Sequence, residues 1–214
     1  MKKTTRRKQQ IQSRNQSVAS ASKLGRWLLA GVMAFGLLQS ATADVQLGDV
    51  DVAGNGCPGG DNVYVFHSQY SGRLIVVFWE YELDQSKSSS RILRQACSAA
   101  IPFSLPPGER LVLESPAMGG YFDMDAETSL QTKMEAFFAG NSSPEVKGTI
   151  ETTDSGETSR YYFRDDNIQV VSQCGEEGIL RLNTSLLLKG KGGTSKANVK
   201  TAAVTLKTEP CSIN

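Results

Sequence analysis

Residues 62–83 read NVYVFHSQYSGRLIVVFWEYEL, and this stretch decides the fold class. In its first part valine alternates with larger aromatic residues, which predicts a β-strand over Asn62–Gln69. The pair Ser71-Gly72 is a turn signal. After it, Arg73–Leu83 is rich in β-branched and aromatic residues, as a second strand requires.

The rest of the chain repeats this pattern outward in both directions. Short apolar runs are separated by turn signals such as Pro106-Pro107-Gly108 and Gly140-Asn141. About ten short strands at this spacing predict an all-β fold, an antiparallel β-sandwich or jelly roll. The further runs are Val45–Val52, Arg110–Glu114, Tyr121–Thr128, Thr132–Ala139, Val146–Thr152, Ile168–Gln173, Ile179–Leu188 and Val199–Lys207.

Two segments leave the choice between strand and helix open. In Ser86–Ala100, the run Ser88-Ser89-Ser90-Arg91 is suited to capping a helical turn. Leu130–Phe138 also fits a helix, although its ending Phe137-Phe138 favours a strand.

The N-terminus has the order of a secretory signal peptide. Met1–Arg26 carries eight basic residues and no acidic one, the apolar run Trp27–Leu38 follows, and small residues end it at Ala41-Thr42-Ala43. The apolar run has twelve residues, whereas a membrane helix needs roughly 20, so a membrane anchor is the weaker interpretation. We therefore predict a signal peptide over residues 1–43, a single domain over 44–214, and a secreted or periplasmic location.

Removal of the signal peptide changes the net charge. The whole chain has 23 basic and 22 acidic residues. The eight basic residues of the signal peptide leave with it, so the mature chain has 15 basic against 22 acidic residues, a net charge of −7. A chain of this charge has no general attraction for nucleic acid or anionic lipid, so neither is an expected partner.

Four cysteines, Cys57, Cys97, Cys174 and Cys211, lie far apart along the chain. An even number in an exported chain indicates disulfides. Of the three connectivities we favour Cys57–Cys97 with Cys174–Cys211, which closes two loops of about 40 residues. No Cys-x-x-Cys pair is present and His67 is the only histidine, so we expect neither a metal site nor a cofactor.

The sequence motifs around and between these cysteines follow one another in a fixed order. They are Gly54-Asn55-Gly56-Cys57-Pro58-Gly59-Gly60, then Gly119-Gly120-Tyr121-Phe122, Cys174-Gly175, Leu182-Asn183-Thr184-Ser185 and a final Cys211. The series resembles a family of small secreted proteins of bacteria and fungi, domain of unknown function 4360, over about Val52 to Cys211. The resemblance implies a secreted four-cysteine β-domain and transfers no catalytic or binding residue.

Candidate catalytic groups are few. His67 falls on a predicted strand in phase with Val63 and Val65, which indicates a structural histidine, and no Gly-x-Ser-x-Gly elbow is present. Two carboxylate series alternate along predicted strands and are best explained as solvated strand faces, with paired glycosidase carboxylates or calcium ligands as alternatives. They are Asp123, Asp125 and Glu127, and Glu80, Glu82 and Asp84.

Aromatic residues offer candidate ligand-binding side chains. Trp79 and Tyr81 should share one strand face and Phe78 the other, and core packing is the favoured role of Trp79. Tyr161 and Tyr162 lie between Arg160 and Arg164 and are better candidates for exposure. The candidate ligand-binding residues are Tyr161, Tyr162 and Trp79.

These observations favour a non-enzymatic envelope or extracellular binding protein, with a glycan or an envelope component as partner and no stable membrane anchor. The alternative is a carbohydrate-active hydrolase that uses paired carboxylates. A row of aromatic side chains on a flat surface would favour the binding protein. An acidic pair in a cleft would favour the enzyme.

Overall fold

The computed structural model describes residues 45–153, 156–175, 177–191 and 193–211. The predicted signal peptide and its cleavage point therefore lie outside the described residues. Two antiparallel sheets make up the described domain, so the predicted all-β sandwich is confirmed. In the described ranges, no helix is long and apolar enough to cross a membrane.

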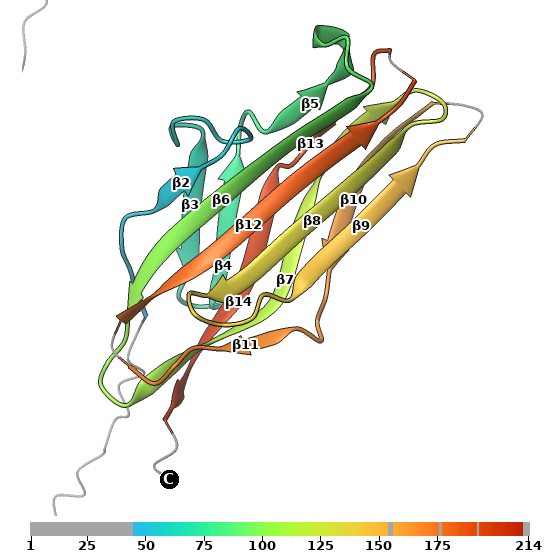
Figure 1. Cartoon of the computed structure of the whole chain (residues 1–214). Helices are drawn as coiled ribbons and strands as arrows, with labels where there is room; N and C mark the ends of the chain where they lie inside the picture. Colours follow the sequence, from blue (N-terminus) through green and yellow to red (C-terminus); the bar gives the residue numbers. More distant parts are fainter. Residues whose placement is uncertain (1–44, 154–155, 176, 192, 212–214) are drawn as a thin grey trace, which may run out of the picture. The chain divides into compact units, whose positions relative to one another are not determined.

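The first sheet has six strands (Figure 1). Its central pair is β6 and β12, which run antiparallel over their whole lengths. The sheet order is β1-β6-β12-β8-β9, and β2 also pairs with β6. The bounds are β1 Gln46–Leu47, β2 Asp51–Ala53, β6 Ile92–Ser104, β8 Ser129–Phe138, β9 Glu145–Glu151 and β12 Glu177–Lys189.

The second sheet has eight strands and stacks against the first. Its order is β3-β4-β14-β7-β13-β5, with β10 and β11 both pairing with β7. The bounds are β3 Val63–Ser68, β4 Arg73–Phe78, β5 Glu82–Asp84, β7 Glu109–Met124, β10 Glu157–Arg164, β11 Gln169–Val171, β13 Lys196–Asn198 and β14 Thr201–Pro210.

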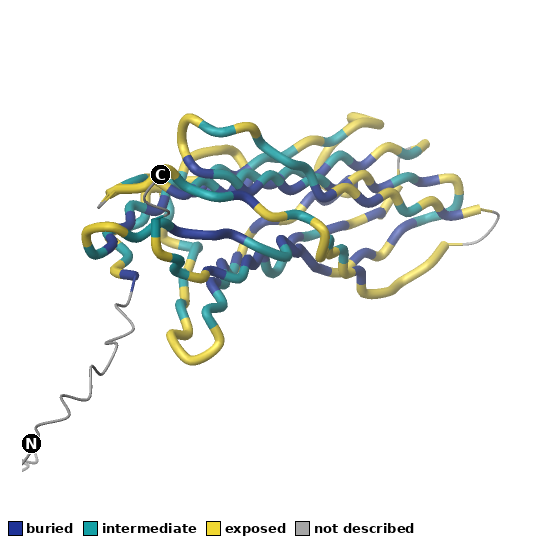
Figure 2. The backbone as a smooth tube through the Cα atoms, turned by 90° about the horizontal axis from the view of Figure 1, so that it is seen from below, coloured by how far each residue is buried: buried dark blue, intermediate teal, exposed yellow. Residues whose placement is uncertain are grey.

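The core forms because alternate residues of each long strand point inward. On β4 the buried positions are Leu74, Val76 and Phe78, and on β12 every second side chain is buried in the same way. Figure 2 shows this alternation of buried and more exposed residues along the strands. The inward rows of both sheets form one apolar cluster.

The structure differs from the sequence-based expectation in the following places. Arg110–Glu114 and the first part of Tyr121–Thr128, up to Met124, belong to one strand, β7. The left-handed Ser115 (φ 50°) lies opposite a register shift in β14 and bulges the strand without ending it. The helical interpretation of Ser86–Ala100 is wrong: only the 3-10 turn Gln85–Lys87 is helical, and β6 begins at Ile92.

The third difference is β10, which the sequence pattern did not predict. Its outward positions are polar or charged near the start, so it lacks the apolar run that marked the other strands. The strand exists because it pairs with β7 along Glu157–Arg164. The possible helix at Leu130–Phe138 is also resolved, in favour of strand β8.

Both disulfides have the predicted pairing. Cys57–Cys97 ties the loop after β2 to β6, with 5.5 Å between the Cα atoms. Cys174–Cys211 ties the segment after β11 to the end of β14, with a Cα separation of 5.9 Å. The first is buried and the second lies nearer the surface.

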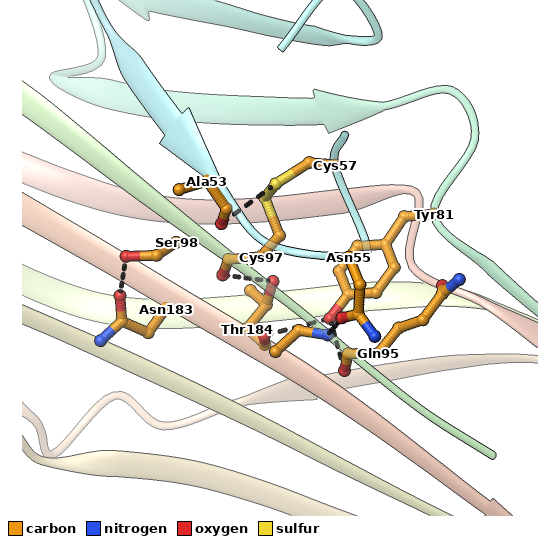
Figure 3. Close-up of a disulfide and its surroundings, with 10 residues drawn as sticks. Ala53, Asn55, Cys57, Tyr81, Gln95, Cys97, Ser98, Asn183 and Thr184 are labelled. Atoms are coloured by element: carbon orange, nitrogen blue, oxygen red, sulfur yellow. Dashed lines mark hydrogen bonds between the residues drawn. A yellow bond between two sulfur atoms is a disulfide. The ribbon is translucent and has the colours of Figure 1, made fainter. Parts of the chain in front are cut away.

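Beside the buried disulfide, Tyr81 crosses the core between the sheets (Figure 3). Its hydroxyl group donates to the carbonyl oxygens of Gln95, at 3.2 Å, and Thr184, at 3.0 Å, on the six-stranded sheet. Burial raises the pKa of Tyr81 to about 12. Gly56 lies against its ring: a Cβ there would be 2.4 Å from the ring atom Cε2.

Candidate binding face

The outward faces of the two sheets differ in chemistry. On the six-stranded sheet, Ser98 donates to Asn183 (2.6 Å) and Asn183 donates to Glu135 (3.2 Å). Lys133 continues this polar row through ion pairs with Glu135 and Glu145. Such a face is what solvent exposure of a sheet requires.

The eight-stranded sheet instead carries apolar rows on its outward face. Directly opposed residues of antiparallel strands point to the same side. One unbroken row crosses five strands, β3, β4, β14, β7 and β10. Its members are Tyr64, Val77, Thr201, Gly119 and Tyr162.

The next row on the same face has large side chains at its ends and small ones in the middle. Phe66 and Ile75 lie at one side, and Arg164 at the other. Ala203 and Ala117 lie between them and are buried although they point outward. The larger side chains around these alanines therefore cover the centre of the sheet.

Trp79 extends this face beyond the end of β4. Its amide donates to the Asn62 carbonyl at 3.0 Å, which continues the β3–β4 ladder by one pair. The indole is 65% exposed and meets the Tyr64 ring edge-on, with 6.2 Å between ring centroids. The prediction that Trp79 packs in the core is therefore wrong.

Trp79 and Tyr81 also fail to share a face. The chain bends at Trp79 and Glu80, so the alternation of β4 does not continue to Tyr81. Tyr81 enters the core, where Phe78 also lies, with its ring centroid 5.4 Å away. Phe78 and Trp79 do lie on opposite faces, as predicted, but Phe78 is the one that packs in the core.

Tyr162 lies against the sheet because glycine is opposite it. Its Cδ2 atom is 3.1 Å from the position that a Cβ of Gly119 would occupy. Its hydroxyl group accepts a hydrogen bond from Nη2 of Arg73, at 3.2 Å, on β4. The ring remains 55% exposed, as the sequence led us to expect.

Tyr161 has the opposite environment, which contradicts its predicted exposure. As the next residue on β10 it points inward and is only 6% exposed. Its hydroxyl group donates to the Asn198 carbonyl at 2.7 Å, and burial raises its pKa. Of the three candidate ligand-binding residues, Trp79 and Tyr162 lie on the outward face and Tyr161 does not.

Tyr121 is a further exposed ring on the outward face of this sheet, whereas the exposed Tyr70 lies in the turn between β3 and β4. Tyr121 lies on β7 opposite Arg160, whose guanidinium carbon is 5.1 Å from the ring centroid. We call the set of exposed rings the aromatic face. Its members are Tyr64, Phe66, Trp79, Tyr121 and Tyr162.

Asp123, Asp125 and Glu127 do not form the expected stripe, because β7 ends at Met124. Asp123 accepts a hydrogen bond from Thr158 at 2.6 Å. Asp125 accepts from the backbone and side chain of Thr194 and from Ser195, and these bonds, led by the Thr194 amide, lower its pKa. Glu127 lies in a turn and pairs with Lys191.

Glu80, Glu82 and Asp84 line one surface depression of about 590 Å³ together with Trp79. Glu80 accepts from Asn62 at 2.6 Å. Asp84 is buried, and the Ser86 hydroxyl group and then the cations of Lys196 and Lys87 lower its pKa to about 2. Only Glu82 is exposed on a strand, so the predicted solvated stripe is wrong for Asp84.

His67 lies on β3 in phase with Val63 and Val65, as predicted. Its Nε2 atom is buried, and no hydrogen-bond partner for it is found among the described residues. Without an orienting carboxylate it has no place in a catalytic triad. Among the described residues, no three His, Cys, Asp or Glu side chains are grouped so that they could hold a metal ion.

Tyr64, Phe66 and Tyr121 were missed as site residues. The alternation of Tyr64 and Phe66 with valine was visible in the sequence. Both sides of that alternation are apolar, however, so periodicity alone did not tell which side faces solvent.

The chain was compared with known families, proteins and structures. A family model described as a domain of unknown function (DUF4360) matches residues 43–211. No curated protein matches the chain.

Similar solved structures share little sequence with it. TmCBM61 in complex with β-1,4-galactotriose is 16% identical, with 75% of this chain and 88% of that one covered and a TM-score of 0.26. Tailspike protein 4 of bacteriophage CBA120 is 11% identical, covering 75% and 19%, with a TM-score of 0.26. A family 11 carbohydrate-binding module from Clostridium thermocellum is 9% identical, covering 78% and 91%, with a TM-score of 0.19. At these scores the similarity carries no argument about ligands.

Proposed function

We propose that this chain, which belongs to the DUF4360 family, is a secreted or periplasmic, non-enzymatic binding module that takes an extracellular glycan on its aromatic face. The observation that carries the proposal is the gathering of Tyr64, Phe66, Trp79, Tyr121 and Tyr162 on one outward sheet face. The expected signal peptide over residues 1–43 delivers the domain to that ligand, and the two disulfides suit an oxidising compartment.

Exposed rings gathered on one surface need an explanation, whereas isolated exposed apolar residues do not. The other sheet shows what the same scaffold builds when its face is only solvated: a row of amides, carboxylates and lysines. The aromatic face departs from that chemistry, so binding is the better account of it.

The shape of the rings suits sugars. The ring of Tyr162 lies over Gly119 with one side open to solvent, and an aromatic ring offers an apolar area next to a polar rim. The apolar C–H faces of a sugar stack on such a ring. The rings are spread over strands β3, β7 and β10 and the bend after β4, so a ligand of several sugar units is favoured over a single sugar.

The test uses the mature protein, residues 44–214, in a glycan and envelope-polymer binding screen. Trp79→Ala and Tyr162→Ala should each weaken binding of any polymer found by about 1 kcal/mol or more, the loss typical of an anchor residue. Ile92→Ala is the matched control, because it removes an exposed large apolar side chain from the other sheet. Equal binding by all three variants would reject the aromatic face as the site.

A second candidate function, a carbohydrate-active hydrolase, is favoured by one observation. Glu80, Glu82 and Asp84 share the depression beside Trp79. Against it, a general acid needs a raised pKa, whereas that of Asp84 is lowered. Turnover of a glycan that disappears in Glu82→Gln, with the fold intact, would establish the hydrolase instead of the binding module.

A further inference from the structure

Three arginines surround the ring of Tyr162. Arg160 and Arg164 are its outward neighbours on β10, because side chains two positions apart on a strand share a face. Arg73 reaches from β4 to hydrogen-bond the Tyr162 hydroxyl group at 3.2 Å. Arg160 is anchored over the ring of Tyr121.

Two of these three cations lack a paired anion in the described parts of the chain. Arg164 forms an ion pair with Asp166 at 2.5 Å. For Arg73 and Arg160, no carboxylate of the described residues lies within ion-pair distance. Each guanidinium instead contacts an aromatic side chain, which holds it in place and leaves donor groups for a ligand.

This gathering of positive charge opposes the charge of the molecule as a whole. The mature chain has 22 acidic and 15 basic residues, so an average part of its surface is expected to carry net negative charge. A local concentration of arginines among exposed rings is therefore complementary to a ligand that carries both sugar-like apolar faces and negative charge.

We infer that the aromatic face binds an acidic glycan, a polymer whose sugar units carry carboxylate groups. The inference rests on the proposed function and names its substrate class. The rings of Tyr162 and Trp79 stack on sugar faces, while Arg73 and Arg160 form bidentate hydrogen bonds with carboxylates of the polymer.

The arrangement also fits the geometry of guanidinium recognition. A guanidinium group is planar and presents its donors in a fixed fork, so it pairs with carboxylate better than lysine does. The three cations placed here beside Tyr162, namely Arg73, Arg160 and Arg164, are arginines. A neutral glycan would offer Arg73 and Arg160 only uncharged oxygen acceptors, which form weaker hydrogen bonds with guanidinium than carboxylates do.

The test compares polygalacturonate with its fully methyl-esterified form, which has the same backbone without the negative charge. The mature protein should bind polygalacturonate at least tenfold more tightly in low salt, and this preference should shrink at 0.5 M NaCl. Arg160→Gln and Arg73→Gln should each lose at least fivefold on polygalacturonate and change little on the esterified polymer.

Control variants separate charge from folding. Arg181→Gln removes an arginine from the six-stranded sheet and should change neither affinity. Arg160→Lys keeps the charge without the fork and should recover only part of the loss. Tyr162→Phe removes the hydrogen bond to Arg73 while it keeps that charge, so it should lose less than Arg73→Gln.

Each other outcome overturns the inference in a distinguishable way. Equal binding of both polymers, reduced by Trp79→Ala, would leave the glycan-binding proposal standing and reject the acidic ligand. Binding of neither polymer, nor of alginate or heparin, would reject the acidic ligand. Tighter binding of single-stranded oligo(dT) than of any glycan would show that the rings and arginines serve nucleic acid.

Discussion

At the scale of single residues, side chains one or two positions apart have opposite roles. Tyr162 is exposed over Gly119 and Tyr161 is buried against Asn198. Trp79 lies on the aromatic face, and Tyr81 bridges the two sheets inside the core. In the first pair the strand period separates the side chains, and in the second a bend does so.

Substitution of Gly56 should disturb the core directly. A Cβ at Gly56 would lie 2.4 Å from the buried ring of Tyr81, whose hydroxyl group is fixed by two carbonyl groups. We expect Gly56→Ala to lower the free energy of unfolding by about 1–3 kcal/mol, the usual cost of overpacking. Urea denaturation followed by fluorescence measures it.

Gly175→Ala is the control, because apart from its chain neighbours no atom of the described residues lies within 4 Å of the Cβ that it would add. It should leave the unfolding free energy nearly unchanged. Equal costs for the two substitutions would mean that the contact between Gly56 and Tyr81 does not limit stability.

At the scale of elements, each disulfide fastens a short segment to a long strand. The closed loops have similar length, since the cysteines are 40 and 37 positions apart. Their surroundings differ, because Cys57 and Cys97 are core residues and Cys174 is exposed. Loop length alone predicts that the two disulfides contribute equally to stability. The difference in burial of their cysteines predicts unequal contributions.

We expect removal of either disulfide to cost up to about 4 kcal/mol through the entropy of the unfolded chain. Cys57→Ala with Cys97→Ala should cost more than Cys174→Ala with Cys211→Ala, because it also leaves a buried cavity. Urea denaturation of the two double variants compares them. An equal or reversed order would show that burial of the sulfur atoms contributes nothing.

At the scale of the whole molecule, the two outer faces of the sandwich differ in chemistry. One carries the lysine and glutamate network of Lys133, Glu145 and Lys147, and the other carries the aromatic face. Ion pairs and hydrogen bonds lower the pKa of several carboxyl groups, among them Asp84 and Glu145, both to about 2. These shifts connect folding to pH.

The protein should lose stability in acid. An unfolded carboxyl group titrates near pH 4, and a group whose pKa is lower in the folded state stabilises the fold above that value. The contribution of Asp84 is therefore complete above about pH 4 and is lost as the pH falls toward 2. Thermal unfolding at intervals from pH 7 to pH 2 should show a decline within this window.

Asp84→Asn tests whether Asp84 contributes to that decline. The variant should be less stable at neutral pH and should lose less stability between pH 4 and pH 2 than the wild type. Parallel curves for the two proteins would show that the ion pairs of Asp84 with Lys87 and Lys196 do not contribute to the pH dependence.

Sequence patterns predicted the fold class and most strand positions, and the disulfide pairing favoured among three possible ones is confirmed. Strand alternation is a local signal and the even cysteine count is a compositional one, so both can be recognised in the sequence alone. Cys57–Cys97 and Cys174–Cys211 pair as expected. His67 was also assigned to the correct strand phase, because its neighbours Val63 and Val65 define that phase.

Which side of a strand such as β3 faces solvent depends on how the two sheets pack, and the sequence pattern did not show this. Tyr64 and Phe66 alternate with valines that are equally suited to a core, so the outward choice depends on which face the other sheet covers. Trp79 keeps the outward phase of β4, and it was misassigned because the wrong side of that alternation was taken as the core. The aromatic face itself combines residues from β3, β7 and β10, which are brought together by strand pairing between distant parts of the chain and not by sequence proximity.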